Sequence, residues 1–185
     1  MSRQQAIEAI NQHFESGAFM QDLARRVAIK TESQVPESHP FLRSYLTNEI
    51  APVLDTMGYN IQILENPSGI AAPFLVARRI EDPSLPTVLT YGHGDVIRGL
   101  EGQWQEGRNP WQLTQVGERY YGRGTADNKG QHSINIAALR AVLETRGKLG
   151  FNSTIMIDTG EEIGSPGLHE FARQHRELLK ADVLI

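Results

Sequence analysis

A chain of 185 residues with 39% hydrophobic and 22% charged residues is long enough for one domain with a substantial core, and its composition is that of an ordinary folded protein. Its net charge of −4 gives no general attraction to nucleic acid or to an anionic membrane, so neither is an expected partner. The absence of cysteine excludes disulfides, thiolate nucleophiles and sulfur-ligated metal, so any metal must be held by nitrogen and oxygen atoms.

The first third of the chain is patterned for helices. Apolar residues at helical spacing predict helices over residues 2–16 and 19–27, and a third over 40–58 that Pro52 should bend or locally break. No basic stretch leads into a continuous apolar segment near Met1, and no apolar run approaches the roughly 18 residues of a membrane span. We therefore expect a cytoplasmic protein without a secretory signal or a membrane partner.

From residue 59 onward, expected strands alternate with expected helices. Strands that need helical crossovers predict an α/β fold, with a mostly parallel mixed sheet flanked by helices on both faces. The last strand stops at Ile185, so we expect residues 1–185 to be a truncated portion of such a domain. The expected strands are 59–64, 73–79, 86–91, 153–158 and 182–185, with β-forming residues around a turn at 111–121. The expected helices are 126–146, with an apolar face of Ile134, Ala137, Ala138, Ala141 and Val142, and 166–179.

Polar clusters follow these strands, at the place where open α/β sheets bind ligands. His93 and Asp95 are two residues apart, so in an extended segment their side chains point the same way. His93 could then bind a metal while Asp95 accepts a hydrogen bond from the other ring nitrogen. Alone, such a pair is more often a turn histidine beside a solvated aspartate.

The two other clusters are also ambiguous when taken singly. The glycine-rich run 122–130 would suggest a nucleotide site, but Asp127 stands where the third glycine of G-x-G-x-x-G belongs. An aspartate before a helix is more often an N-cap than a metal ligand. Glu161 and Glu162 follow a strand between glycines, and neighbouring carboxylates repel unless a cation or a shared proton intervenes. The alternative for this pair is a solvated acidic loop.

Together the clusters carry a resemblance. His-x-Asp at residue 93, Tyr-Gly-Arg-Gly-x-x-Asp-x-Lys-Gly ending at residue 130 and Gly-Glu-Glu-x-Gly-Ser ending at residue 165 resemble one metallopeptidase family. Its members include carnosinase, carboxypeptidase G, acetylornithine deacetylase, succinyl-diaminopimelate desuccinylase and aminoacylase. The similarity extends over residues 86–185, and the helical first third fits the same layout.

The resemblance implies a role for each matched residue. His93 would ligate a first zinc ion, Asp127 would bridge two zinc ions, and Glu162 would ligate the second. Glu161 would be the general base and Asp95 would orient His93. The family also has a cis peptide after the bridging aspartate, here Asp127–Asn128.

The activity that the resemblance implies is hydrolysis of a dipeptide or an N-acyl amino acid by a water that bridges two Zn²⁺ ions, with Mn²⁺ or Co²⁺ as alternatives. An aspartate and a histidine ligand, and a lid and dimerisation domain, would lie beyond Ile185. The truncated chain should therefore be inactive alone, and the full-length protein a homodimer. The alternatives are a non-catalytic metal-binding or structural fragment, and a nucleotide-binding α/β domain.

Overall fold

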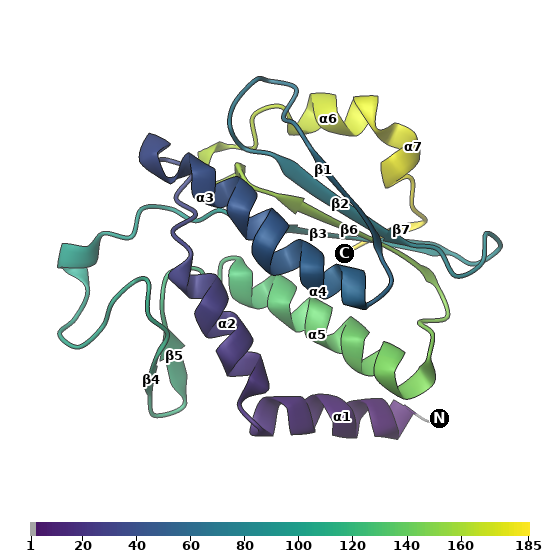
Figure 1. The fold of residues 1–185 in the computed structure, drawn as a ribbon, viewed down its shortest axis with the longest axis horizontal. Helices are drawn as coiled ribbons and strands as arrows, with labels where there is room; N and C mark the ends of the chain where they lie inside the picture. Colours follow the sequence, from purple (N-terminus) through teal and green to yellow (C-terminus); the bar gives the residue numbers. More distant parts are fainter. Residues whose placement is uncertain (1–2) are drawn as a thin grey trace. The chain divides into compact units, whose positions relative to one another are not determined.

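The computed structural model describes residues 3–185 (Figure 1). The chain forms two compact units. The first unit combines the segment up to Ile29 with Gly99–Gly150, and the second combines Lys30–Arg98 with Phe151–Ile185. Each unit is thus assembled from two separate stretches of the chain, an arrangement that the sequence did not predict. None of the helices within residues 3–185 is long and apolar enough to span a membrane.

The first unit is mainly helical. Gly17, with φ of 81°, separates its first two helices, and Gly147, with φ of 73°, ends the long one, so the first helix and the long one end at or next to their predicted last residues, 16 and 146. Both of the first two helices pack against the long one. The elements of this unit are α1 (Arg3–Glu15), α2 (Ala18–Ala28), the 3-10 turn η3 (Glu101–Gln103), the hairpin strands β4 (Thr114–Val116) and β5 (Arg119–Tyr121), and α5 (Lys129–Arg146).

Helix α5 differs from its predicted form in two ways. It begins at Lys129 rather than at 126, and Ile134, placed on the apolar face by the sequence, is 59% exposed. Hydrogen bonds between α5 and the end of α2 explain why α5 presents a different face to the interior than the sequence predicted. Arg26 donates to the hydroxyl of Ser133, and the Lys129 ammonium donates to the main-chain carbonyls of Arg26, at 2.9 Å, and Ile29, at 2.6 Å. These polar contacts turn Ile136, Ala137 and Ala141 inward.

Replacing Lys129 with methionine should destabilise this unit. The Lys129 side chain is fully buried, so its loss leaves two inward-facing carbonyls without the ammonium, while the desolvation cost of burying the charge is removed. We expect a net loss of about 2 kcal/mol in the free energy of unfolding. Urea denaturation of the intact protein measures it, with the exposed Lys148→Met as the matched control. Equal midpoints for the two variants would contradict this account.

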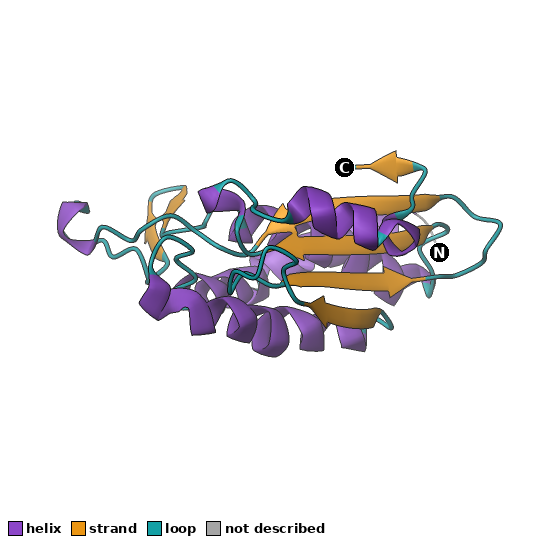
Figure 2. Cartoon of the chain, turned by 90° about the horizontal axis from the view of Figure 1, so that it is seen from above, coloured by secondary structure: helices purple, strands orange, loops and turns teal. Residues whose placement is uncertain are grey.

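The second unit contains a mixed five-stranded sheet in the order β1-β2-β6-β3-β7 (Figure 2). Strand β3 pairs in parallel with β6 and β7, whereas β2 pairs antiparallel with β1 and β6. The predicted mixed α/β sheet is therefore confirmed. Its parallel pairs are β3–β6 and β3–β7, and β3 and β6 end beside each other. The strands are β1 (Asn60–Leu64), β2 (Phe74–Arg79), β3 (Thr87–His93), β6 (Asn152–Asp158) and β7 (Val183–Leu184).

Helices cover both faces of this sheet. On one face, α6 (Leu168–Gln174) and α7 (Arg176–Leu179) bury Phe171 against Phe74 and Met156, with the two phenyl rings stacked at 4.2 Å. The sequence predicted a single helix over 166–179. The structure interrupts it at His175, whose ring packs against that of Phe171 at 4.5 Å. On the opposite face the buried Tyr45 lies against the strand ends of β3 and β6.

Tyr45 belongs to the irregular helix that the sequence predicted around Pro52. The helix widens immediately before the proline, because Pro52 has no N–H to continue the ladder. In the widened turn the N–H of Ala51 donates to the carbonyl of Leu46, five residues earlier. The predicted local break is thus confirmed. Its elements are the 3-10 turn η1 (Pro36–Ser38), α3 (His39–Ser44), the π-helical η2 (Tyr45–Ile50) and α4 (Ala51–Thr56).

Candidate metal centre

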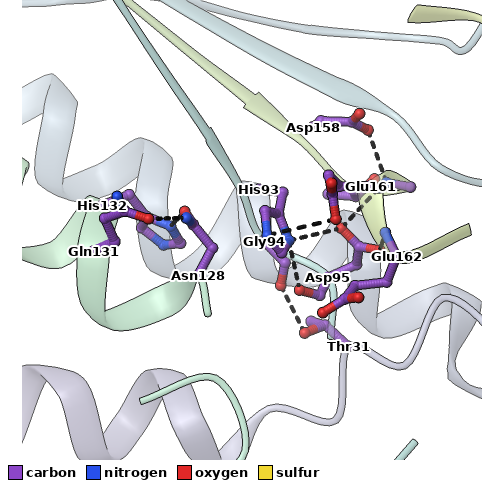
Figure 3. Close-up of polar contacts among 12 residues, drawn as sticks. Thr31, His93, Gly94, Asp95, Asn128, Gln131, His132, Asp158, Glu161 and Glu162 are labelled. Carbon is purple, nitrogen blue, oxygen red and sulfur yellow. Dashed lines mark hydrogen bonds and ion pairs between the residues drawn. The ribbon is translucent and has the colours of Figure 1, made fainter. Parts of the chain in front are cut away.

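The centre forms where β3 and β6 end beside each other in the second unit. His93, the last residue of β3, is in register with Asp158, the last residue of β6. The strand therefore runs two residues beyond its predicted end at Tyr91. Gly94 follows, and its N–H donates to the Asp158 carbonyl at 2.7 Å, while its own carbonyl accepts from the Thr31 hydroxyl at 2.7 Å (Figure 3). A Cβ on Gly94 would lie 2.8 Å from the Tyr45 ring, so this turn requires glycine.

The imidazole of His93 is held in one orientation. The ring is buried, and its Nδ1 lies 3.1 Å from the main-chain carbonyl of Asp95 and 3.4 Å from the Asp95 carboxylate. Its Nε2 lies 3.8 Å from a carboxylate oxygen of Glu161. Because Nδ1 faces two acceptors, we assign the ring proton to Nδ1. That tautomer presents the Nε2 lone pair toward the glutamates.

Asp95 connects the imidazole with the glutamate loop. Its side chain is fully buried, and its carboxylate accepts the main-chain N–H groups of Glu161, at 3.1 Å, and Glu162, at 3.0 Å. The sequence suggested only the contact with His93, because the i, i+2 spacing shows neighbours along the chain. That spacing cannot predict a contact between Asp95 and the loop that follows a different strand. Asp95 therefore fixes the main chain of the glutamates as well as facing the ring.

Glu161 and Glu162 open a short 3-10 turn, η4 (Glu161–Ile163). One ligand atom from each of His93, Glu161 and Glu162 lies within 4.8 Å of the other two. Carboxylates this close repel unless a cation or a shared proton lies between them. One imidazole nitrogen and two carboxylate oxygens suit Zn²⁺ and related divalent ions, so these residues fit the metal that the sequence predicted.

Asp127, the predicted bridging ligand, belongs to the first unit. The Asp127–Asn128 peptide is cis, as expected from the resemblance. The Asn128 side chain contacts Gln131, and its amide oxygen lies 3.3 Å from Nδ1 of the buried His132. Four of the five predicted site residues therefore belong to the second unit and Asp127 belongs to the first, and the roles of all five stay predictions.

The glycine-rich run before α5 does not have the features of a phosphate site. Its lysine, Lys129, is buried and donates to the carbonyls of Arg26 and Ile29, so the ammonium does not face a ligand. Gly130 allows the turn to close, because its N–H donates to the Gly124 carbonyl at 3.0 Å. The nucleotide-binding alternative loses its main support.

Asp158 is a polar residue that the sequence named only as a strand end. Its carboxyl is fully buried and accepts the N–H of Gly160 at 2.7 Å. Burial raises the pKa of Asp158, and the negative charge of Asp95 raises it further, against the opposing hydrogen bonds from Ser165 and Gly160. Burial also raises the pKa of the neighbouring Tyr91 hydroxyl, which lies 3.4 Å from the Asp158 carboxyl.

The sequence of this chain matches a model of a known protein family. The model of Peptidase family M20/M25/M40 matches residues 89–185, which is more than half of the chain and includes all five predicted site residues. The chain belongs to this family. The resemblance drawn from the three motifs is thereby confirmed.

Individual members of the family are similar over most of the chain. The Beta-Ala-His dipeptidase of Mus musculus is 31% identical over 86% of this chain, and the Cysteinylglycine-S-conjugate dipeptidase of Corynebacterium striatum is 28% identical over 89%. The crystal structure of human carnosine dipeptidase 1 has a TM-score of 0.87 at 28% identity, covering 98% of this chain and 40% of that one. This chain spans about a third of the length of these curated relatives, 34% and 35% respectively.

Proposed function

We propose that the intact protein is a metal-dependent hydrolase that cleaves the amide bond of a dipeptide or an N-acyl amino acid. The observation that carries the proposal is the convergence of His93, Glu161 and Glu162 at the ends of β3 and β6. Membership of a peptidase family supports the reaction type. The names of two relatives, both dipeptidases, favour a short peptide as the substrate.

The proposed ligand set is the one that the resemblance implies, and the gathering of His93 and Glu162 supports part of it. His93 would hold one zinc ion, Glu162 a second, and Asp127 would bridge the two, with Mn²⁺ or Co²⁺ able to replace Zn²⁺. An aspartate and a histidine beyond Ile185 would complete the set. The 185-residue chain would then be inactive alone, and the intact protein would be a cytoplasmic homodimer.

In this proposal Glu161 is the general base. Bound divalent ions lower the pKa of water, so that a nucleophile exists near neutral pH. The Glu161 side chain is 44% exposed, whereas its main chain is held by the buried Asp95, so the carboxylate reaches water while the backbone stays in place. Glu161 would accept the proton of the attacking water and return it to the departing amine nitrogen, as the C–N bond breaks and the new C–O bond forms.

Metal removal tests the proposal. The intact protein should lose dipeptide hydrolysis after dialysis against a chelator and regain it with Zn²⁺, Mn²⁺ or Co²⁺. The 185-residue chain is the comparison, since it should bind Zn²⁺ weakly and hydrolyse nothing. Hydrolysis by the intact protein that survives complete metal removal would refute the proposal. An intact protein that binds Zn²⁺ tightly but hydrolyses no dipeptide and no N-acyl amino acid would support the non-catalytic alternative instead.

A further inference from the structure

We propose that Asp158 is a positioning residue that holds the loop 159–165 so that Glu161 and Glu162 face His93. This inference rests on the proposed function, because it gives those glutamates their role at the metal. Asp158 does not belong to the group of possible metal ligands formed by His93, Glu161 and Glu162, so we infer a different role for it.

The loop is closed by its own hydrogen bonds. The N–H groups of Ile163 and Ser165 both donate to the carbonyl of Gly160, at 3.3 and 2.8 Å, and the N–H of Gly164 donates to the carbonyl of Glu161 at 2.8 Å. These contacts fold 160–165 into a tight turn with the two glutamates at its start. They define the shape of the turn, but none of them joins it to the sheet.

Asp158 joins both ends of this turn to the sheet. Its carboxyl accepts the N–H of Gly160 at the beginning and the hydroxyl of Ser165 at the end. The same carboxyl accepts from the hydroxyl of Tyr91 on the neighbouring strand β3. Ser165 has φ of 48°, a backbone conformation that non-glycine residues rarely adopt. A bond from its side chain to a buried group helps to keep Ser165 in that conformation.

Two buried carboxyls therefore hold the glutamate segment, one from each strand. Asp95, just after β3, accepts the main-chain N–H groups of Glu161 and Glu162, while Asp158, at the end of β6, holds the residues on either side. These bonds engage main-chain N–H groups, so the carboxyls of Asp95 and Asp158 place the backbone of the glutamates. Loss of Asp158 should let the turn shift while the strand remains.

The test compares Asp158→Ala with Thr154→Val. Thr154 lies on the same strand and is equally buried, and its hydroxyl has no hydrogen-bond partner among residues 3–185, so its replacement changes the strand without touching the loop. In the metal-free intact protein, Asp158→Ala should speed amide hydrogen exchange at 160–162, and Thr154→Val should not. The Co²⁺ affinity of Asp158→Ala should fall about tenfold or more, as is typical when support of metal ligands is removed. Its Co²⁺ absorption spectrum should change, and kcat should fall more than KM rises.

Conservative variants separate positioning from a general loss of structure. Asp158→Asn keeps an oxygen that accepts the Gly160 N–H, so its exchange rates and Co²⁺ affinity should return toward the wild-type values. Ser165→Ala removes one bond only and should move both readouts in the direction of Asp158→Ala, which keeps the test valid if that variant does not fold. Loop exchange and Co²⁺ affinity in Asp158→Ala or Ser165→Ala that match Thr154→Val would overturn the inference. A wild-type protein that binds no Co²⁺ would refute the proposed metal centre, while the exchange rates would still decide the role of Asp158.

Discussion

Replacing Glu161 with glutamine should lower kcat of the intact protein by about 10²- to 10⁴-fold, the range typical for loss of a general base. Glutamine keeps the size of the side chain and the main-chain N–H that donates to Asp95. The carboxylate that would carry the proton is the only group lost. Steady-state hydrolysis of a dipeptide, measured at saturating metal, gives the effect.

The same variant decides between two roles for Glu161. The resemblance makes Glu161 the base and Glu162 the ligand, whereas the geometry gathers both carboxylates near His93. A base can be removed with little change in Zn²⁺ affinity, but removal of a ligand should weaken Zn²⁺ binding. Glu177→Gln, an exposed glutamate on α7, is the matched control. Wild-type turnover by Glu161→Gln would contradict the assignment, and a large loss of Zn²⁺ affinity would make Glu161 a ligand instead.

Replacing Gly130 with alanine should destabilise the protein by about 3 kcal/mol or more, a size reserved for severe overpacking. A Cβ at this position would lie 1.8 Å from the main-chain carbonyl oxygen of Thr125. The obstacle is backbone, so no side-chain rotation relieves the clash. The turn between Gly124 and Gly130 must open, and Asp127 lies within that turn. Because we propose Asp127 as a metal ligand, the proposed hydrolysis by the intact protein should fall together with the urea midpoint.

Gly102→Ala is the matched control for this variant. Apart from its chain neighbours, Gly102 has no heavy atom of the described residues within 4 Å of an added Cβ, and its φ is not in the left-handed region. Its free energy of unfolding should change by less than about 0.5 kcal/mol. Equal urea midpoints for Gly130→Ala and Gly102→Ala would show that the turn accepts a side chain, against the proposed close approach.

Much of the fold could be predicted because its signals are local. Apolar spacing placed the helices before residue 58, and Pro52 indicated the irregular helix, because a missing N–H acts on its own turn. The rotation of α5 could not be predicted in this way. It depends on contacts of Lys129 and Ser133 with the end of α2, more than a hundred residues earlier in the chain. The apolar pattern predicts that Ile134 is buried because its side chain is apolar. The pattern contains no information about the hydrogen-bond partners of Lys129 and Ser133.

In the candidate site, too, some residues could be predicted from the sequence and others could not. His93, Glu161 and Glu162 could be named because their residue types and spacing match a family pattern, and the geometry then brings them together. The task of Asp158 could not be named, since an aspartate at the end of a strand is commonplace. Beside its local bond with Gly160, Asp158 accepts a hydrogen bond from Tyr91 on the neighbouring strand, which only folding brings within reach.

The bonds from Asp95 to the N–H groups of Glu161 and Glu162 have a consequence for engineering. These bonds involve only main-chain N–H groups, so they do not depend on which side chains residues 161 and 162 carry. An aspartate or histidine introduced at position 162 would therefore have the same backbone placement. The metal preference of the proposed centre could then be changed by exchanging one donor group without altering the surrounding structure.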